Sequence, residues 1–306
     1  MLTGTSHRHA TSLVASLITA LIMLTSSPAW AGSCCALPAI FDEGRLLATG
    51  GVSQIEGAGG GGLGAWATIT GYGTRDGIGV NAHLTYLNLP NYALWSPGVA
   101  IGLFDRLELS YARQSFDTEA DGAALGLGRG FTFHQSIFGA KLRLLGNIVY
   151  DQNTLLPQLS VGVQFKNADR GAVLSAIGAK ASSGTDFYLA ASKLILSQSL
   201  LLNLTLRATK ANQFGLLGFG GNRNANYAME LEGGLAYLLS RRLAVGGEVR
   251  TKPDNLRIAH EGSAYDLFAA YFLNKNLSFT LAYVSLGNIV NRNHPDGVYL
   301  SVQGGF

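Results

Sequence analysis

Apolar residues recur at every second position along most of the chain. From 200 to 209 the even positions hold leucine or alanine, whereas the odd positions include Asn203, Thr205 and Arg207. From 227 to 239 the odd positions hold Tyr, Met, Leu, Gly, Leu, Tyr and Leu. Because successive side chains of a strand point to opposite faces, this period of two predicts strands with one apolar and one polar face.

Short polar turns and longer loops rich in Gly, Asn and Asp alternate between these segments. The short turns are predicted at 104–106, 197–199, 240–242 and 274–276, and the long loops at 117–130, 167–186, 211–226, 252–262 and 287–297. One long connection, residues 146–157, falls on the side of the short turns. Strands of about 9–11 residues arranged in this way are typical of a transmembrane antiparallel up-and-down β-barrel, with the short turns in the periplasm.

The predicted fold is therefore all-β, with about fourteen strands, an even number as in bacterial barrels. The first predicted strand has the weakest pattern, so a barrel of twelve strands is the alternative. The strands are predicted at 46–54, 65–73, 77–88, 97–104, 107–116, 133–145, 158–166, 186–196, 200–210, 227–239, 243–252, 263–273, 277–285 and 298–306.

The first 31 residues have the three-part layout of a secretory signal peptide. A polar start containing Arg8 precedes an apolar run at 13–25, and small residues stand at Ala29 and Ala31. We predict cleavage after Ala31, because the apolar run is shorter than the roughly 20 residues that a spanning helix needs. The predicted organisation is a signal peptide at 1–31, a short periplasmic leader at 32–45 and an outer-membrane barrel at 46–306.

The two cysteines, Cys34 and Cys35, are neighbours in the predicted leader. Their adjacency excludes a long-range disulfide framework, and the sequence leaves their role open. The predicted location of the mature protein is the Gram-negative outer membrane.

Composition separates this barrel from its rival, a secreted β-sandwich. Charged residues make up 13% of the chain, which is few for the solvent face of a sandwich, and there are 40 glycines. The polar face is rich in small residues, which suits a barrel interior. Aromatic residues near the predicted strand ends, including Trp66 and Tyr72, suggest interfacial girdles. The net charge of +3 gives no case for nucleic-acid binding.

Charged residues of both signs stand on the polar face and are predicted to face the lumen. They are Glu108, Lys141, Arg143, Lys166, Arg207, Glu230, Glu232, Glu248, Arg250 and Asp266. They form either an internal ion-pair network or the wall of a hydrated pore, and we favour a porin-like passive channel for small solutes. The alternative is a non-conducting barrel with a structural, binding or adhesive role. Its lumen would be closed by the glycine-rich segment or by the loop at 167–186.

The run from Gly57 to Gly62 formally matches a dinucleotide-binding motif, but a strand pattern follows it where that motif needs a helix. We therefore interpret the run as a linker or as a close-packed loop folded into the lumen. His134 and Ser136 share a strand face, which raises a membrane-embedded lipid hydrolase as a second alternative. No third orienting group is evident. The sequence predicts no catalytic residue, no cofactor and no metal site, and hence no enzyme.

The last strand resembles the C-terminal recognition strand of outer-membrane barrels. Val298, Leu300, Val302 and Phe306 share one face, although Gly304 departs from the usual pattern. We predict these four residues to be an assembly signal. The expected partners are outer-membrane lipids, the barrel-assembly machinery and, if the lumen is open, a small solute; the oligomeric state is left open.

Three segments together resemble the domain-of-unknown-function family 3034, a set of predicted Gram-negative outer-membrane proteins. They are the glycine-rich run 46–63, residues 69–76 and residues 103–114. The resemblance extends over nearly the whole mature chain. It implies an outer-membrane location and a barrel architecture, and it implies no activity.

Overall fold

The computed structural model describes residues 44–151, 154–258, 260–290 and 292–306. The predicted signal peptide with its cleavage site after Ala31, both cysteines and nearly all of the predicted leader lie outside the described residues.

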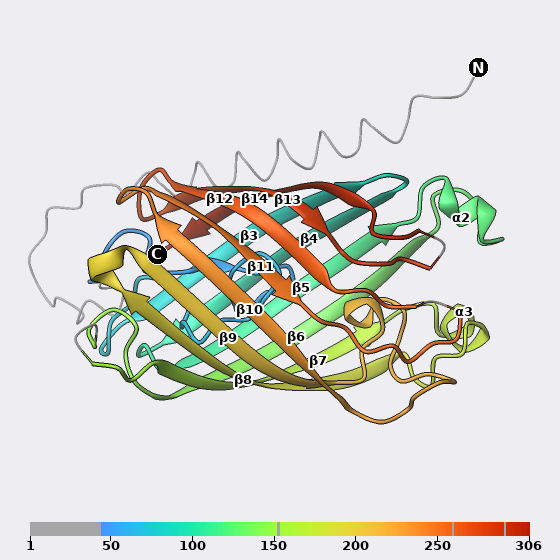
Figure 1. The fold of residues 1–306 in the computed structure, drawn as a ribbon, viewed down its shortest axis with the longest axis horizontal. Helices are drawn as coiled ribbons and strands as arrows, with labels where there is room; N and C mark the ends of the chain where they lie inside the picture. Colours follow the sequence, from blue (N-terminus) through green and yellow to red (C-terminus); the bar gives the residue numbers. More distant parts are fainter. Residues whose placement is uncertain (1–43, 152–153, 259, 291) are drawn as a thin grey trace, which may run out of the picture. The chain divides into compact units, whose positions relative to one another are not determined.

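Twelve antiparallel strands form a closed barrel (Figure 1). They are β3 (Ile78–Leu89), β4 (Tyr92–Leu103), β5 (Leu107–Asp117), β6 (Thr132–Leu145), β7 (Gln158–Ala168), β8 (Ser183–Ile195), β9 (Leu200–Thr209), β10 (Ala228–Leu238), β11 (Leu243–Arg250), β12 (Ala264–Phe272), β13 (Leu277–Ser285) and β14 (Asp296–Gly305). Each strand pairs with its neighbours in sequence, and β14 pairs with β3 to close the ring. The predicted fold class is confirmed, with the alternative count of twelve.

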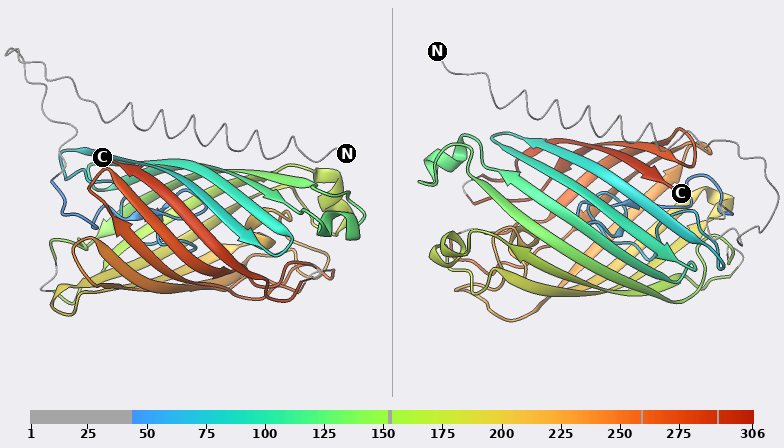
Figure 2. Two further views of the ribbon diagram at one scale, coloured as in Figure 1. Left: turned by 90° about the horizontal axis from the view of Figure 1, so that it is seen from above. Right: turned by 180° about the vertical axis from the view of Figure 1, so that it is seen from behind.

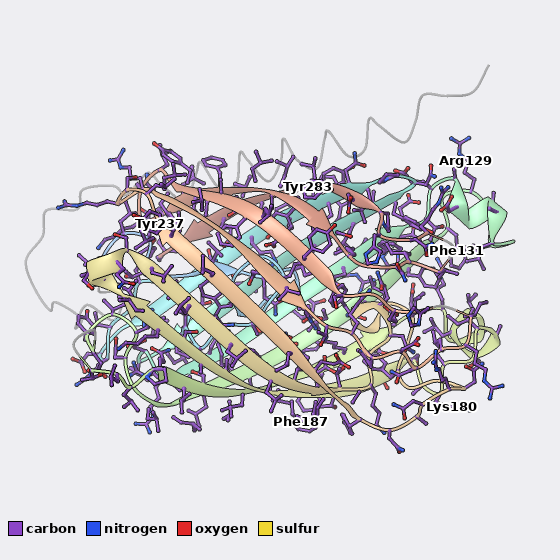
Figure 3. All side chains as sticks on the ribbon, in the orientation of Figure 1. Arg129, Phe131, Lys180, Phe187, Tyr237 and Tyr283 are labelled. Carbon is purple, nitrogen blue, oxygen red and sulfur yellow. The ribbon has the colours of Figure 1, made fainter. Side chains whose placement is uncertain are left out.

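The strands alternate between an apolar outer face and a polar inner face. Leu204 is 59% exposed whereas the next residue, Thr205, is fully buried, and Leu300 and Ser301 differ in the same way, at 47% and 2%. Figure 3 shows aromatic side chains such as Phe187, Tyr237 and Tyr283 on the outside of the barrel. Among the described residues, no helix is long and apolar enough to cross a membrane.

The two ends of the barrel differ in their connections. The turn end carries the C-terminus and the connections 104–106, 146–157, 196–199, 239–242 and 273–276. The loop end carries the connections 118–131, 169–182, 210–227, 251–263 and 286–295 and the tight turn 90–91; these loops include α2 (Asp121–Ala124), α3 (Gly171–Ala176) and η2 (Gln213–Gly215). A further short helix, η1 (Leu196–Gln198), lies at the turn end. The long connection 146–157 lies at the turn end, as predicted.

Two predicted wall strands, 46–54 and 65–73, are not part of the barrel. Residues 53–73 instead run inside the lumen, where every one of them is buried, and we call them the luminal segment. At the start of the segment, β1 (Val52–Ser53) pairs with β2 (Gly59–Gly60) in a two-stranded sheet of two residues each. Figure 2 shows the segment, in blue, within the ring of strands in both views. Trp66 and Tyr72, which we expected in the girdles, are also in the lumen.

The prediction of residues 46–54 and 65–73 as wall strands was wrong for a physical reason. Alternation predicts a strand with an apolar row, but it does not say whether that row meets lipid or the inside of the protein. Pairing of β14 with β3 leaves no free edge to which a further strand could add.

The loop end is closed by an apolar core. Ile55 and Leu63 of the luminal segment pack in one buried cluster with side chains of the strands and of the loops above them. The loops contribute Leu174, Leu216 and Ile289 to this cluster. The lumen is therefore covered by packed side chains at this end.

Candidate functional site

The charged residues that we predicted in the lumen surround the luminal segment. Glu108, Lys141, Lys166, Arg207, Glu232, Glu248, Arg250 and Asp266 are buried inside the barrel. The other two predicted residues lie nearer the ends of the barrel and are only partly buried. Arg143 pairs with Asp105 at the turn end, at 2.7 Å, and Glu230 accepts a hydrogen bond from the Thr251 hydroxyl.

Six of the buried charges form a closed ring of ion pairs, which we call the charge ring. In order around the ring they are Lys166, Glu56, Arg250, Glu232, Arg207 and Asp186, each within 4 Å of the next. The ring alternates in sign and carries no net charge. Five members belong to the adjacent strands β7 to β11, and Glu56 alone belongs to the luminal segment.

Glu56 joins the two ends of this row of strands. Its carboxylate contacts Lys166 of β7, and its Oε2 lies 2.9 Å from Nη1 of Arg250 of β11. On the wall side, Lys166 Nζ lies 2.7 Å from Asp186 Oδ2, and Arg250 Nε lies 3.2 Å from Glu232 Oε1. Without Glu56 the wall would hold three buried cations and two anions. A buried charge is stable only when it is paired, so the ring is complete only with the segment in place.

Wall carboxylates also bind the backbone of the segment. Gly59 N–H donates to Glu108 Oε1 at 2.9 Å, and Ala65 N–H donates to Glu232 Oε2 at 2.9 Å. Glu248 Oε2 accepts from the N–H groups of both Gly62 and Leu63, at 2.5 and 2.8 Å. These bonds satisfy backbone N–H groups that would otherwise be buried without a partner.

The glycine-rich run is required by this close approach. A Cβ atom on Gly61 would lie 2.1 Å from Glu248 Oε1, and one on Gly62 would lie 2.7 Å from Asp266 Oδ2. Both distances are too short for a side chain to fit without movement of the carboxylates. Of our two interpretations of residues 57–62, the structure has the close-packed loop in the lumen and not the linker.

The carbonyl groups of the segment are likewise bonded by wall side chains. Lys141 Nζ donates to Gly59 O at 2.8 Å, and the hydroxyls of Thr205 and Ser160 donate to Ala65 O and Ala67 O, both at 2.7 Å. The segment is joined to the wall backbone at its end, where Tyr72 N–H donates to Phe306 O. The wall strands β3 to β14 pair with one another in a closed ring, so their hydrogen-bond ladder is complete without the segment.

Apolar cavities lie on both sides of the luminal segment. The turn-end cavity, of about 80 Å³, lies between the segment and the inner faces of β8 to β12. The loop-end cavity, of about 100 Å³, lies beneath the loops and is lined by aromatic and aliphatic side chains of the apolar core.

A buried ion pair ties two loops together above the loop-end cavity. Lys252 Nζ lies 2.7 Å from Glu261 Oε2, and Glu261 Oε1 accepts from Gln213 N–H at 2.9 Å. Burial lowers the pKa of Lys252 and raises the pKa of Glu261, and their attraction opposes both shifts. The pair fastens loop 251–263 to loop 210–227.

The serine–histidine pair of the lipid-hydrolase alternative is not assembled. His134 Nδ1 lies 2.9 Å from the hydroxyl of Ser115, and the Ser136 hydroxyl accepts from Arg113 at 3.1 Å. In the part of the chain that the structure describes, no hydrogen bond joins His134 to Ser136. Within those same residues no group of three or more His, Cys, Asp or Glu side chains is placed to hold a metal ion.

The four residues of the predicted assembly signal all have exposed side chains. Val298, Leu300 and Val302 lie on the outer face of β14, and Phe306 directly follows that strand. Their part in assembly stays a prediction.

Sequence reasoning missed two members of the charge ring, Glu56 and Asp186. Asp186 stood at the boundary between a predicted loop and a predicted strand. Glu56 stood outside the alternating pattern, but it is the only charged residue between Arg45 and Arg75. A single charge in so long a neutral stretch was the signal that could have identified it.

Several solved outer-membrane barrels have a similar architecture. The KdgM porin in complex with disordered oligogalacturonate is 11% identical, with 74% of this chain and 99% of that chain covered and a TM-score of 0.47. An outer-membrane channel from Pseudomonas putida F1 is 14% identical, with 75% and 94% covered and a TM-score of 0.43. The outer-membrane phospholipase A from Escherichia coli is 10% identical, with 78% and 93% covered and a TM-score of 0.38. Similarity at this level does not identify a ligand or a reaction.

A family model matches most of the chain. No curated protein matches the chain in sequence. The model of the family described as Protein of unknown function (DUF3034) matches residues 49–303, which include the luminal segment and nearly all of the barrel. The chain, with its glycine-rich luminal segment and its twelve-stranded wall, therefore belongs to this family.

Proposed function

We propose that the protein is an outer-membrane β-barrel channel for small solutes, closed by its luminal segment and opened when that segment is displaced. The observation that carries the proposal is that the wall and the luminal segment are held by different kinds of hydrogen bond. The wall closes on itself through β14 and β3, whereas the segment is held mainly by wall side chains. Displacing the segment therefore leaves the ladder of the wall intact.

The proposal includes a location in the Gram-negative outer membrane, with the turn end in the periplasm. It is supported by the apolar outer face and by the asymmetry between short turns and long loops. Outer-membrane lipids and the barrel-assembly machinery are partners under this proposal.

The inner wall favours a hydrated path once the segment has left. Charges of both signs from β5 to β12 would then line the lumen. Twelve strands lie between the eight of small filled barrels and the 16–18 of open porins. A barrel of this size has room either for a segment or for a small solute.

The second candidate is a non-conducting barrel with a structural or binding role. It is favoured by the complete burial of residues 53–73 together with the apolar core at the loop end. Conductance separates the two candidates, because the non-conducting barrel gives no current even when the segment is loosened.

The test removes the two cations that hold Glu56. Lys166→Met with Arg250→Met leaves this carboxylate buried without its cations, a defect that typically costs about 3–5 kcal/mol. We expect the refolded double variant to show discrete conductance steps in planar bilayers where the wild type is mostly closed.

The matched control is Arg292→Met, because Arg292 forms a two-point ion pair with Asp121 at the loop end, away from the segment. This variant should stay closed. Heat-modifiable migration on gels shows whether each barrel has folded. A folded double variant that stays as silent as the wild type would overturn the proposal in favour of the non-conducting barrel.

A further inference from the structure

We propose that the turn-end cavity is a binding site for a small aromatic alcohol, that is, an apolar ring carrying one hydroxyl group. This inference rests on the proposed function, since it names the class of solute that the closed channel would accept.

The wall of the cavity is unusual for a barrel interior. Inward positions of membrane barrels are generally polar, yet this cavity is lined by Leu194, Leu201, Leu238, Phe268 and Phe272. The same row of strands carries polar residues elsewhere. On β8 and β9 the charge-ring members Asp186 and Arg207 lie toward the loop end, and the apolar residues lie toward the turn end. The apolar patch is therefore a local feature of the lumen.

The luminal segment covers this patch without filling it. Trp66 and Thr68 of the segment line the cavity opposite β8 to β12, and about 80 Å³ is left between them. Apolar cavities of about 150 Å³ in other proteins stay dry and bind benzene. The turn-end cavity has about half that volume, is partly open and has aromatic walls, so it suits a single small ring.

One polar atom in the cavity lacks a hydrogen-bond partner. The Oγ1 atom of Thr68 is buried, and within the described residues nothing donates to it or accepts from it. The Thr68 residue is 5% exposed. Leaving a buried hydroxyl unsatisfied is costly, and the hydroxyl of a bound ring would satisfy it. Apolar walls with one polar contact are the usual composition of a small-molecule site.

Trp66 provides a direct readout of this cavity. Beyond residue 31 the chain has one other tryptophan, Trp95, whose ring lies tilted against that of Tyr86 with the ring centroids 4.4 Å apart. In a Trp95→Phe background, 4-bromophenol bound in the cavity should quench the fluorescence of Trp66 through the heavy atom. We expect quenching that saturates with concentration.

Two neighbouring alanines of β12 give a matched pair of variants. Ala270 lines the cavity, whereas Ala269 stands on the opposite face of the strand. Ala270→Leu should fill the cavity and abolish saturable quenching, and Ala269→Leu should leave it unchanged. Thr68→Val, which replaces the hydroxyl with a methyl group of similar size, should weaken the binding of 4-bromophenol about fivefold, the value of one hydrogen bond. It should leave the binding of bromobenzene unaffected.

The outcomes separate this site from the proposed channel. Quenching that is linear in concentration and equal in both alanine variants reflects partition into detergent and overturns the site. Saturable quenching lost only in Ala270→Leu supports it, whatever the conductance test gives, because binding is measured with the segment in place. A conducting double variant without saturable quenching would keep the channel and reject the aromatic alcohol.

Discussion

The barrel wall and the luminal segment have similar sequence patterns but are stabilised in different ways. Wall strands bond to each other through their backbones, and each presents an exposed apolar row on its outer face. The segment has almost no ladder of its own and is held by side chains from most of the surrounding strands. Alternation of apolar and polar residues therefore specifies an extended, strand-like chain. Closure of the sheet decides which of these segments form the barrel wall.

This difference makes the two regions separable by mutation. A change on the lipid face should destabilise the wall and leave the contacts of the segment alone. A change at a contact of the segment should free it within an intact barrel. The charge-ring variants described above should have the largest effect on the segment. The following predictions test the wall and the segment in decreasing order of expected effect.

Leu204→Arg should destabilise the wall strongly. Leu204 is 59% exposed on the outer face of β9, and an arginine at mid-membrane costs about 2–4 kcal/mol. The measurement is the free energy of unfolding in lipid vesicles. Leu204→Ala is the control, since it removes the same side chain without adding charge. A cost no greater than that of the alanine variant would mean that this face does not meet lipid.

The neighbouring Thr205 illustrates how the segment changes the expectation for an inward position. In a water-filled lumen an arginine there would be solvated. In this structure the Thr205 hydroxyl is fully buried and donates to Ala65 O at 2.7 Å, so a larger residue meets the segment before it meets water.

Gly61→Ala should loosen the segment and leave the wall intact. The new Cβ would lie 2.1 Å from the Glu248 carboxylate, and overpacking of this kind typically costs about 1–3 kcal/mol. Hydrogen exchange followed by mass spectrometry should show faster exchange across residues 53–73 and unchanged exchange in β3 to β14.

The control is Gly171→Ala, because no atom lies within 4 Å of a Cβ at that position. It should leave both regions as in the wild type. Equal exchange in the two variants would show that close approach to Glu248 does not hold the segment.

The sequence predicted the wall far better than the segment. The predicted strand 277–285 coincides with β13, and 107–116 ends one residue before β5 does. The outer face of these strands carries a regular apolar row, so their alternating pattern is complete. For residues 65–73 the alternation was real, but the apolar row meets the inside of the protein.

The site was predictable only in its wall half. Wall charges such as Lys166 and Glu232 interrupt an alternating strand on its polar face, and this placed them in the lumen. Glu56 belongs to an irregular loop, so no periodicity indicates where its side chain points. Its two cationic partners are 110 and 194 residues away in sequence, and only the closed barrel brings them together.

The smallest effect on stability is expected where wall and segment meet, at Phe306. Its carbonyl oxygen accepts from Tyr72 N–H of the segment at 2.9 Å and from Val80 N–H of β3 at 3.2 Å. Phe306→Ala keeps these backbone bonds and removes one ring that is 39% exposed, so the unfolding free energy should fall by only about 1 kcal/mol.

Assembly should nevertheless fall more than this stability change explains, if the apolar row that ends at Phe306 is read before the barrel closes. The measurement is the amount of heat-modifiable protein in outer-membrane fractions, set beside the unfolding free energy of refolded protein in vesicles. Leu281→Ala is the control, because Leu281 is an outward leucine of the adjacent strand β13, 55% exposed, and lies outside the terminal row. Equal loss of assembly in both variants would reduce the effect to lost lipid contact. A loss confined to Phe306→Ala separates recognition of the terminal strand from its stability. The backbone bonds that residue 306 makes to the wall and to the segment are the same in the wild type and in Phe306→Ala.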